Sequence, residues 1–240
     1  MLTENQLYNL DAKTALLTFP PVKPVQTWVW DPPYNIQFKY EGFDDNNPNY
    51  DEWVEETARL MFNNTNEGGS MFFIHYPIDC ARLLPHLMKA GWNMHQWITW
   101  VYPANFGHSK KRFTKASRTI LWLSKSEPYF DSKATVQPYK NPNDKRIKKL
   151  IEEGAKGTAH YDWWEINLCK NTSSDYRGYA NQIPYALIER CILHTSKQGD
   201  TIGDPCGGSG STYRVAIDWG RGVYGCDLSL EAFKLWDDLF

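Results

Sequence analysis

The sequence lacks long apolar runs, a signal-peptide pattern and paired cysteines. These are the features that would indicate a membrane span, secretion, or a disulfide or structural metal site. No apolar run approaches the roughly 20 residues needed to span a bilayer, and the N-terminal residues have neither the basic nor the apolar region of a signal peptide. The five cysteines are scattered without any C-x-x-C pair, so neither a disulfide framework nor a zinc site is indicated. We therefore expect a cytoplasmic protein of prokaryotic or phage type, with reduced cysteines, no metal and no membrane partner.

A large net charge is also absent. The 26 basic and 28 acidic residues leave a formal charge of −2, so bulk charge gives no reason to expect nucleic acid. The local distribution differs, because the segment from Pro103 to Ser126 carries Lys and Arg but no Asp or Glu. Such a run is either a solvated face or a phosphate-binding surface. Aromatic residues are abundant, at 15% with 11 Trp, and they both fill cores and stack on bases.

Apolar runs and helical periodicity alternate along the chain. We expect strands near 27–30, 70–74, 92–101, 119–124, 201–203 and 223–226, and helices near 50–62, 81–90, 144–153, 184–194 and 211–219, with a last helix closing the chain. This alternation predicts an α/β three-layer sandwich with a mostly parallel sheet. We expect one catalytic domain over residues 1–240, a mobile loop at 35–49 and a small target-recognition insertion at about 103–165.

The first chemical motif is Asp31-Pro32-Pro33-Tyr34, directly after the strand predicted at 27–30. The prolines cannot continue a central strand, so Asp31 must lie at its carboxyl end. The lone pair of an exocyclic base amine is delocalised into the ring, and the Asp31 carboxylate and the rigid Pro32 carbonyl can accept its N–H groups and redirect that lone pair. Tyr34 can stack on a base that has left the duplex. The alternative is a surface turn with a capping Asp.

The second motif is a glycine-rich turn between a predicted strand and helix, Gly203-Asp-Pro-Cys-Gly-Gly-Ser-Gly-Ser-Thr212. A turn of this kind suits a nucleotide-like ligand at the carboxyl edge of a parallel sheet. Tyr213 stands where a dinucleotide fingerprint needs Gly or Ala, and no Gly-Lys-Ser/Thr phosphate loop is present. The turn therefore favours an adenosyl ligand without phosphates. Asp227, at the next strand end, can bind its ribose hydroxyls or cap a helix.

These motifs together resemble the permuted (β-class) amino-methyltransferases of DNA, which act on adenine N6 or cytosine N4 and carry the catalytic motif before the cofactor motif. The resemblance covers most of the chain. It rests on NLDA at 9–12, DPPYN at 31–35, GGSMFFIH at 68–75, TILWLSK at 119–125, DWWEI at 162–166, NQIPYALIER at 181–190, GDTIGDPCGGSGST at 199–212 and GCDLS at 225–229. It implies a circularly permuted Rossmann-like methyltransferase sheet and S-adenosyl-L-methionine as cofactor.

The resemblance also implies roles for individual residues. The catalytic turn is Asp31, Pro32, Pro33 and Tyr34, and the cofactor-binding positions are Asp11, Gln182, Asp204, Pro205, Cys206, Gly208, Ser209, Gly210 and Asp227. Asp11 matches an acid that contacts the cofactor adenine, and Asp204 one near the methionine amino group. Ile183 replaces a lysine usual in the family, so the polar contact from that position is not expected here. Cys206 replaces an aromatic residue, so packing against the cofactor should be looser at Cys206.

Double-stranded DNA is the partner that the resemblance implies, and whether the chain forms a homodimer is left open. Lys110, Lys111, Arg112 and Lys115 are the expected phosphate contacts. The DPPY form is associated mostly with adenine N6, so we expect sequence-specific N6-adenine methylation of a flipped base, with N4-cytosine methylation as the close alternative and RNA left open. Two alternatives belong to other functional classes: a catalytically silent nucleic-acid-binding module and a nicotinamide oxidoreductase.

Overall fold

The computed structural model describes residues 5–40, 43–102, 110–111 and 113–237, and among them most strands belong to one sheet. The strands of this sheet are β1 (Gln6–Tyr8), β2 (Val25–Trp30), β5 (Thr65–His75), β6 (Asn93–Val101), β7 (Ser117–Ser124), β8 (Trp163–Glu165), β9 (Thr201–Asp204) and β10 (Gly222–Cys226). A separate hairpin pairs β3 (Lys39–Tyr40) with β4 (Phe43–Asp44). The helices are α1 (Ala12–Thr18), α2 (Tyr50–Asn63), α3 (Pro77–Lys89), α4 (Lys145–Glu152), α5 (Tyr185–Thr195), α6 (Ser211–Asp218) and α7 (Leu230–Lys234).

The sheet order is β1-β10-β9-β2-β5-β7-β6-β8, and every pairing except those of β7 is parallel. The predicted mostly parallel sheet is therefore confirmed. Because β2 and β9 are neighbours, the segments that follow them leave the sheet side by side at one edge. The Asp31–Tyr34 turn follows β2 and the glycine-rich turn follows β9, so the topology brings the two sequence motifs together.

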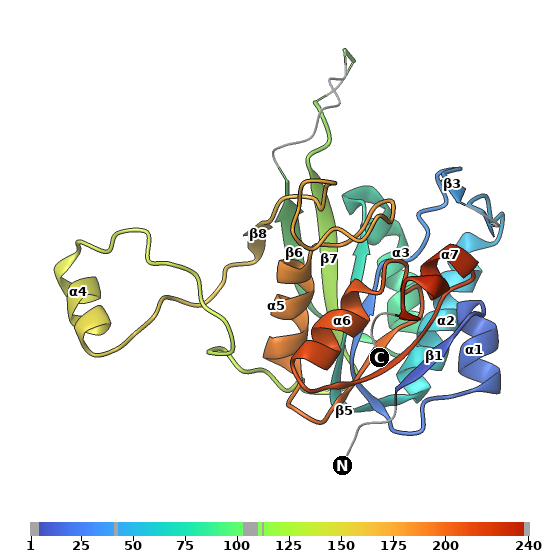
Figure 1. Ribbon diagram of the computed structural model, residues 1–240, viewed down its shortest axis with the longest axis horizontal. Helices are drawn as coiled ribbons and strands as arrows, with labels where there is room; N and C mark the ends of the chain where they lie inside the picture. Colours follow the sequence, from blue (N-terminus) through green and yellow to red (C-terminus); the bar gives the residue numbers. More distant parts are fainter. Residues whose placement is uncertain (1–4, 41–42, 103–109, 112, 238–240) are drawn as a thin grey trace.

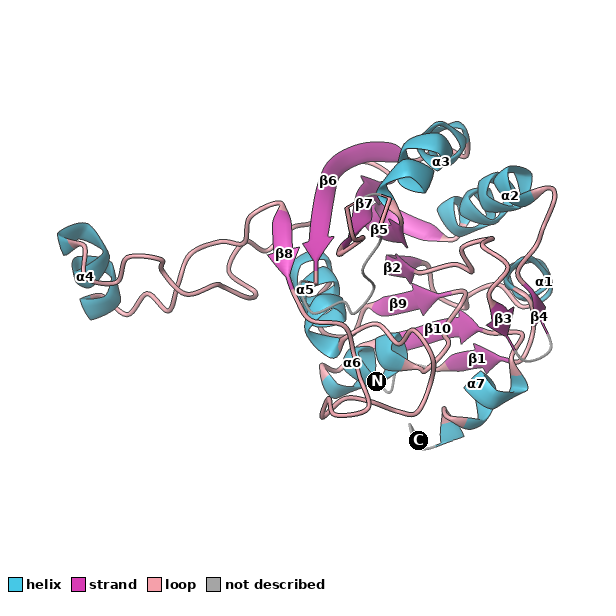
Figure 2. Cartoon of the chain, turned by 90° about the horizontal axis from the view of Figure 1, so that it is seen from above, coloured by secondary structure: helices cyan, strands magenta, loops and turns pink. Residues whose placement is uncertain are grey.

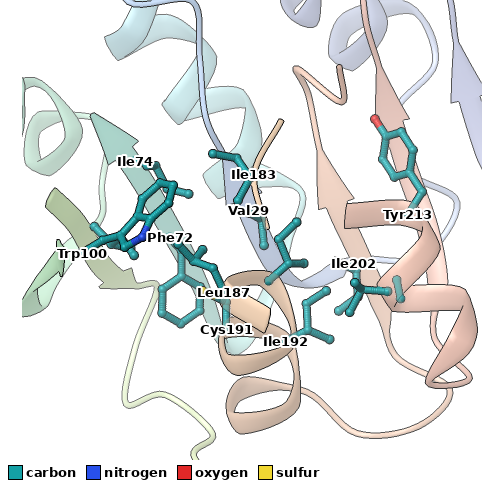
Figure 3. Packing of buried hydrophobic residues seen from close by; sticks show 14 of the residues in the cluster. Val29, Phe72, Ile74, Trp100, Ile183, Leu187, Cys191, Ile192, Ile202 and Tyr213 are labelled. Carbon is teal, nitrogen blue, oxygen red and sulfur yellow. The ribbon is translucent and has the colours of Figure 1, made fainter. Parts of the chain in front are cut away.

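Helices cover both faces of the sheet, which confirms the three-layer sandwich, and α5 and α6 lie across one face in Figure 1. Alternate residues of β2 face opposite layers: Trp28 and Trp30 pack with α1, α2 and α3, whereas Val29 packs with α5 and α6. The α5 side is mainly apolar, and Figure 3 shows Leu187, Cys191 and Ile192 of α5 pointing toward Val29, Phe72 and Ile202. This two-sided burial explains why all six residues of β2 are buried.

Three predicted elements differ in extent. Gly68 and Gly69 were expected to precede a strand, but both lie inside β5, which begins at Thr65. α3 begins at Pro77, earlier than its apolar periodicity indicated, because proline is well accommodated in the first turn of a helix. Pro85 lies inside α3 without ending it. The loop predicted at 35–49 contains the β3–β4 hairpin.

The segment between β7 and β8 projects from the body as a long arm with α4 at its tip (Figures 1 and 2). We call residues 131–162 the arm. None of the residues of α4 is buried. The insertion expected at about 103–165 also includes β7, which pairs with β5 and β6 inside the sheet, so the projecting part is shorter than that range. Among the described residues, no helix is both long and apolar enough to cross a membrane.

Candidate active site

The two motifs open on one cavity of about 560 Å³ at the carboxyl edge of β2, β9 and β10. All four residues of the turn line it, together with Pro205, Cys206 and residues 207–209 of the glycine-rich turn. This volume is typical of small-molecule and cofactor sites. The wall also includes Asp11, Ile36, Phe38, Asp45, Tyr50, Tyr76, Arg118, Gln182, Asp204 and Asp227.

Tyr34 closes over the Asp31 carboxylate. Its hydroxyl donates a hydrogen bond of 2.6 Å to Oδ1 of Asp31, and its ring stacks on His75 with centroids 4.1 Å apart. The guanidinium carbon of Arg118 lies 5.1 Å from the centre of the Tyr34 ring. Tyr34, whose ring was expected to stack on a base, is thus only 9% exposed, and its ring contacts His75 and Arg118 instead. A base that enters must share Asp31 with Tyr34 or displace the Tyr34 side chain.

Burial and charge act in opposite directions on Asp31. Removal from water disfavours the charged carboxylate and raises its pKa to about 6, whereas the positive charge of Arg118 and the Tyr34 hydrogen bond pull the pKa down. Arg118 is itself buried on β7, and it also lies over the Trp100 ring, 5.3 Å from its centre. The site therefore holds an aspartate that is ionised at neutral pH and becomes protonated only slightly below it.

A hydrogen-bond relay from α2 fixes the proline turn. The Tyr50 hydroxyl donates to the Pro33 carbonyl at 2.6 Å. The backbone N–H of Tyr76 donates to Nδ1 of His75, so the proton of this neutral imidazole lies on Nε2, 3.4 Å from the Tyr50 oxygen. Burial lowers the pKa of His75 to about 4, which keeps the ring neutral at neutral pH. Tyr50 and His75 therefore orient the turn without adding charge.

The residues after the turn are anchored by a second aspartate. Asp45 is 2% exposed, and its carboxylate accepts the backbone N–H groups of Asn35, Ile36 and Phe38 at 2.7, 3.0 and 3.1 Å. Asn35 and Asn47 exchange two further hydrogen bonds across the loop. The loop predicted to be mobile is thus tied to a buried carboxylate and holds one wall of the cavity in place.

The glycine-rich turn is built around Asp204. The carboxylate of Asp204 accepts from the Cys206 backbone N–H at 3.0 Å and from the Thr212 hydroxyl at 2.6 Å. Burial raises its pKa to about 7, opposed by these two hydrogen bonds. Asp227 accepts from the backbone N–H groups of Gly208 and Ser229, both at 2.8 Å, so it connects the turn after β9 with the end of β10.

Tyr213 explains the departure from the dinucleotide fingerprint. Its hydroxyl donates to the Asp204 carbonyl at 2.7 Å, and its buried ring fills the space over two glycines. A Cβ at Gly207 would lie 2.1 Å from the Tyr213 oxygen, and a Cβ at Gly225 would lie 2.0 Å from it. In a dinucleotide fold, Gly or Ala at this position lets the helix pack closely on the strand. Here the Tyr213 side chain fills that space instead.

Comparison with known proteins decides the family. The model of the N6_N4_Mtase family, described as DNA methylase, matches residues 25–237. The chain belongs to this DNA methylase family. The expected resemblance is confirmed, and the match excludes a nicotinamide oxidoreductase. The chain is thus an S-adenosylmethionine-dependent DNA amino-methyltransferase of the restriction-modification type.

Relatives and solved structures agree with this family. The chain is 29% identical over 230 residues to the Type II methyltransferase M1.MboII of Moraxella bovis, covering 87% of this chain and 86% of the relative. It is 29% identical over 248 residues to the Type II methyltransferase M.BglII of Bacillus subtilis, covering 95% and 66%. The crystal structure of M1.HpyAVI (TM-score 0.66, 19% identity, 98% of both chains) and that of the cytosine-N4-specific PvuII DNA methyltransferase (TM-score 0.75, 18% identity, 99% and 87%) share the fold.

The cavity fits the cofactor of this methyltransferase family. Carboxylates from three separate segments, Asp11, Asp204 and Asp227, line one side, which suits a ligand bearing an ammonium group, a sulfonium and two ribose hydroxyls. Gly208 lines the cavity with φ 47°, and an added Cβ would lie 3.1 Å from the Tyr179 ring, so glycine allows both this backbone conformation and the close approach of that ring. The donor set and the cavity volume are both compatible with S-adenosylmethionine.

Several predicted cofactor residues also have structural duties in this methyltransferase. Asp11 caps α1 by accepting the backbone N–H groups of Lys13 and Thr14 at Oδ1. Gln182 donates to the Asp175 carbonyl and accepts from the Arg177 backbone N–H, so its amide fixes residues 175–177. Ile183, which replaces the family lysine, is 8% exposed and packs in the apolar cluster around α5 (Figure 3).

The predicted phosphate contacts are only partly within the described residues. Lys110, Lys111 and Lys115 are exposed, and Arg112 lies outside the described residues. The Lys115 ammonium lies 4.3 Å from the centre of the Tyr76 ring, and Tyr76 packs edge-on against Tyr34 with centroids 5.1 Å apart. One predicted cation is therefore located at the rim of the catalytic cavity.

Sequence reasoning missed four contributors to the site: Arg118, His75, Tyr50 and Asp45. Arg118 was counted only as part of a basic run, and His75 entered only as the last residue of the motif GGSMFFIH. The signal for Arg118 was its place next to TILW, because a cation at the start of a buried strand needs a partner in the fold. No local pattern distinguishes Asp45 from the acids around it.

Proposed function

We propose that this methyltransferase transfers a methyl group to N6 of adenine in double-stranded DNA, at a specific sequence and after the target base leaves the duplex. The observation that carries the proposal is the meeting of the DPPY turn and the glycine-rich turn in one cavity, from neighbouring strands β2 and β9. Adenine is favoured by the DPPY form of the turn. A further relative, the DNA adenine methyltransferase YhdJ of Escherichia coli (strain K12), is 24% identical over 230 residues.

The proposed cofactor contacts follow the three acids. Asp227 is assigned to the ribose hydroxyls, Asp204 to the methionine ammonium and Asp11, through the oxygen not used for capping, to the adenine amino group. Residues 205–209 contribute backbone and small side chains beside the ligand, whereas Gly210 is the N-cap residue of α6 and does not line the cavity. S-adenosylmethionine supplies, when bound, a methyl group already activated on a sulfonium, so the protein has to orient and polarise the nucleophile.

The nucleophile is polarised by Asp31 and Pro32. Because Tyr34 uses Oδ1 of Asp31, Oδ2 is assigned to one N–H of the target amine, and the Pro32 carbonyl to the other. These two acceptors pull the amine toward tetrahedral geometry and aim its lone pair into the cavity. Holding the amine in line can contribute roughly 7 to 11 kcal/mol toward the barrier. The Asp31 carboxylate is also placed to take the proton that the methylated amine releases.

Arg118 keeps this acceptor charged. A protonated Asp31 would donate rather than accept at one oxygen and would lose its attraction for the developing positive charge on the amine nitrogen. The guanidinium of Arg118 opposes the effect of burial on the Asp31 pKa. We therefore assign Arg118 as a positioning residue that acts on the amine through Asp31 and Tyr34.

DNA would be held by the rim and read by the arm. Lys110, Lys111, Arg112 and Lys115 are proposed as phosphate contacts on the rim, and each lost contact should reduce the slope of log affinity against log salt by about 0.9 on duplex DNA. The arm, with Lys145, Arg146, Lys148 and Lys149 on α4, is proposed as the target-recognition part.

Mass spectrometry of nucleosides tests the proposal. Unmethylated genomic DNA is incubated with the enzyme and isotopically labelled S-adenosylmethionine and then digested to nucleosides, with an RNA sample in parallel. Labelled N6-methyladenine from DNA is the expected product. Labelled N4-methylcytosine would overturn the assignment to adenine and leave the mechanism in place. Cofactor binding by calorimetry with no labelled nucleoside would instead support a catalytically silent DNA-binding module.

A further inference from the structure

Two apolar side chains are exposed at the cavity, just after the catalytic turn. Ile36 is 52% exposed and Phe38 is 37% exposed, and both line the cavity that contains Asp31. They lie on the segment that leads into the β3–β4 hairpin, at the opposite side of the molecule from the arm (Figure 2). Large apolar groups exposed beside a ligand cavity commonly mark a contact surface.

The backbone holds these two side chains outward. The Asp45 carboxylate accepts the N–H groups of both Ile36 and Phe38, and Asn35 and Gln37 adopt φ angles of 55° and 60°. Positive φ is unfavourable for a residue such as glutamine, so this conformation needs the charge-assisted hydrogen bonds that Asp45 accepts. The loop is therefore built to keep its apolar side chains exposed instead of folding them into the core.

The surroundings point to duplex DNA as the occupant. The cavity continues from Ile36 and Phe38 to the catalytic carboxylate, and Lys115 lies beside Tyr76, another residue of the cavity wall. A strand that delivers its base to Asp31 must place the bases next to the target close to the residues of this wall. Extruding a base leaves an unstacked gap that costs a few kcal/mol, and apolar side chains are known to stabilise such gaps by inserting between base steps.

We propose that Ile36 and Phe38 enter the duplex beside the extruded base and pack against the neighbouring bases that it leaves unstacked. This inference rests on the proposed function, because it requires a target base that leaves the duplex. Asp45 is then a positioning residue for the wedge, since it fixes the backbone that presents both side chains.

The test compares Ile36→Ala/Phe38→Ala with Leu17→Ala, a control that removes a 64% exposed apolar side chain from α1, outside the cavity wall. Each protein is assayed on a duplex containing a methylation site identified with the wild-type enzyme. The same target strand is then assayed opposite an abasic position, where the base is already unpaired and cheaper to extrude. Thermal unfolding and S-adenosylmethionine affinity are measured for every variant.

The double variant should lose roughly 10- to 100-fold in kcat/KM on the paired duplex, the range expected when base stacking is removed. On the abasic duplex the loss should shrink to about threefold or less, because less work is required to open that site. Leu17→Ala should match the wild type on both. Equal losses on the two duplexes, or no loss on the paired one, would overturn the wedge. Failure to find any DNA site that the wild type methylates would instead count against the proposed function.

Discussion

At the scale of single residues, the proposed chemistry depends on a carboxylate, Asp31, whose pKa is set by opposing effects. Burial raises the pKa of Asp31 to about 6, while Arg118 and Tyr34 restrain the increase. An acceptor must be ionised to polarise the target amine, so activity should be present above this pKa and lost as pH falls through it. We predict that kcat/KM of the wild type decreases on the acid side with an apparent pKa near 6.

Arg118 variants test whether the charge of Arg118 lowers the pKa of Asp31. Arg118→Met removes the positive charge that lowers the Asp31 pKa, so the acid limb should move to higher pH and activity at pH 7 should fall. Arg118→Lys keeps a charge and should restore much of the wild-type profile. The measurement is the pH dependence of kcat/KM, with S-adenosylmethionine affinity as control. An unshifted acid limb in Arg118→Met, with lower activity at every pH, would show that Arg118 is only structural.

At the scale of elements, the motifs and most strands and helices were predictable, whereas the supports of the turn were not. The strand end at Asp31 follows from two prolines, and the parallel sheet follows from the strand–helix alternation. Tyr50 reaches the Pro33 carbonyl from 17 residues along the chain, and Asp45 reaches the Ile36 N–H from nine, through contacts that depend on how α2 and the loop pack. β1 and β8, with three residues each, are too short for any periodicity to indicate them.

Tyr50 of α2 provides a test of the relay to the turn. Tyr50→Phe removes the hydrogen bond to the Pro33 carbonyl and should lower kcat by about tenfold, as expected for the loss of about 1.4 kcal/mol of transition-state alignment. Unfolding free energy should fall by about 1 kcal/mol. Cofactor affinity should not change, because the lost bond holds the turn rather than the glycine-rich segment.

Tyr224→Phe is the matched control for this substitution. The Tyr224 hydroxyl is buried on β10 and has no hydrogen-bond partner among the described residues. Its removal should leave stability equal or higher, since an unsatisfied buried hydroxyl is costly, and should leave kcat unchanged. If both variants lost the same activity, the effect of Tyr50→Phe would be a general consequence of removing a buried hydroxyl.

At the scale of the whole molecule, the arm is separate from the catalytic body. The two strands of chain that form the arm are joined near the body by a β-bridge between Gln137 and Thr158. The arm is also tied to α5, because the Thr135 hydroxyl lies 2.9 Å from His160 Nε2 and 2.7 Å from Nε2 of His194 on α5. Figures 1 and 2 both show α4 well away from the sheet. The body should therefore fold and bind cofactor without the tip.

Shortening the arm tests this separation. Replacing residues 141–154 by Asn-Gly retains the Gln137–Thr158 bridge and removes α4. The melting temperature and S-adenosylmethionine affinity should stay at wild-type values, because no residue of α4 is buried. Site-specific methylation of DNA should be lost or lose its sequence preference, as read by methylation-sensitive sequencing. An unchanged preference would place target recognition elsewhere in the molecule.

In the proposed mechanism, methyl transfer depends on Asp31, and the most direct measurement is methyl transfer to DNA by Asp31→Ala beside cofactor binding by the same protein. Transfer of labelled methyl groups should fall by about a thousandfold or more, the scale of losing a group that polarises the reacting atom. The Kd for S-adenosylmethionine should stay within about threefold of the wild type, under 1 kcal/mol in binding free energy. Turnover retained by Asp31→Ala would contradict the role of this carboxylate and the mechanism built on it.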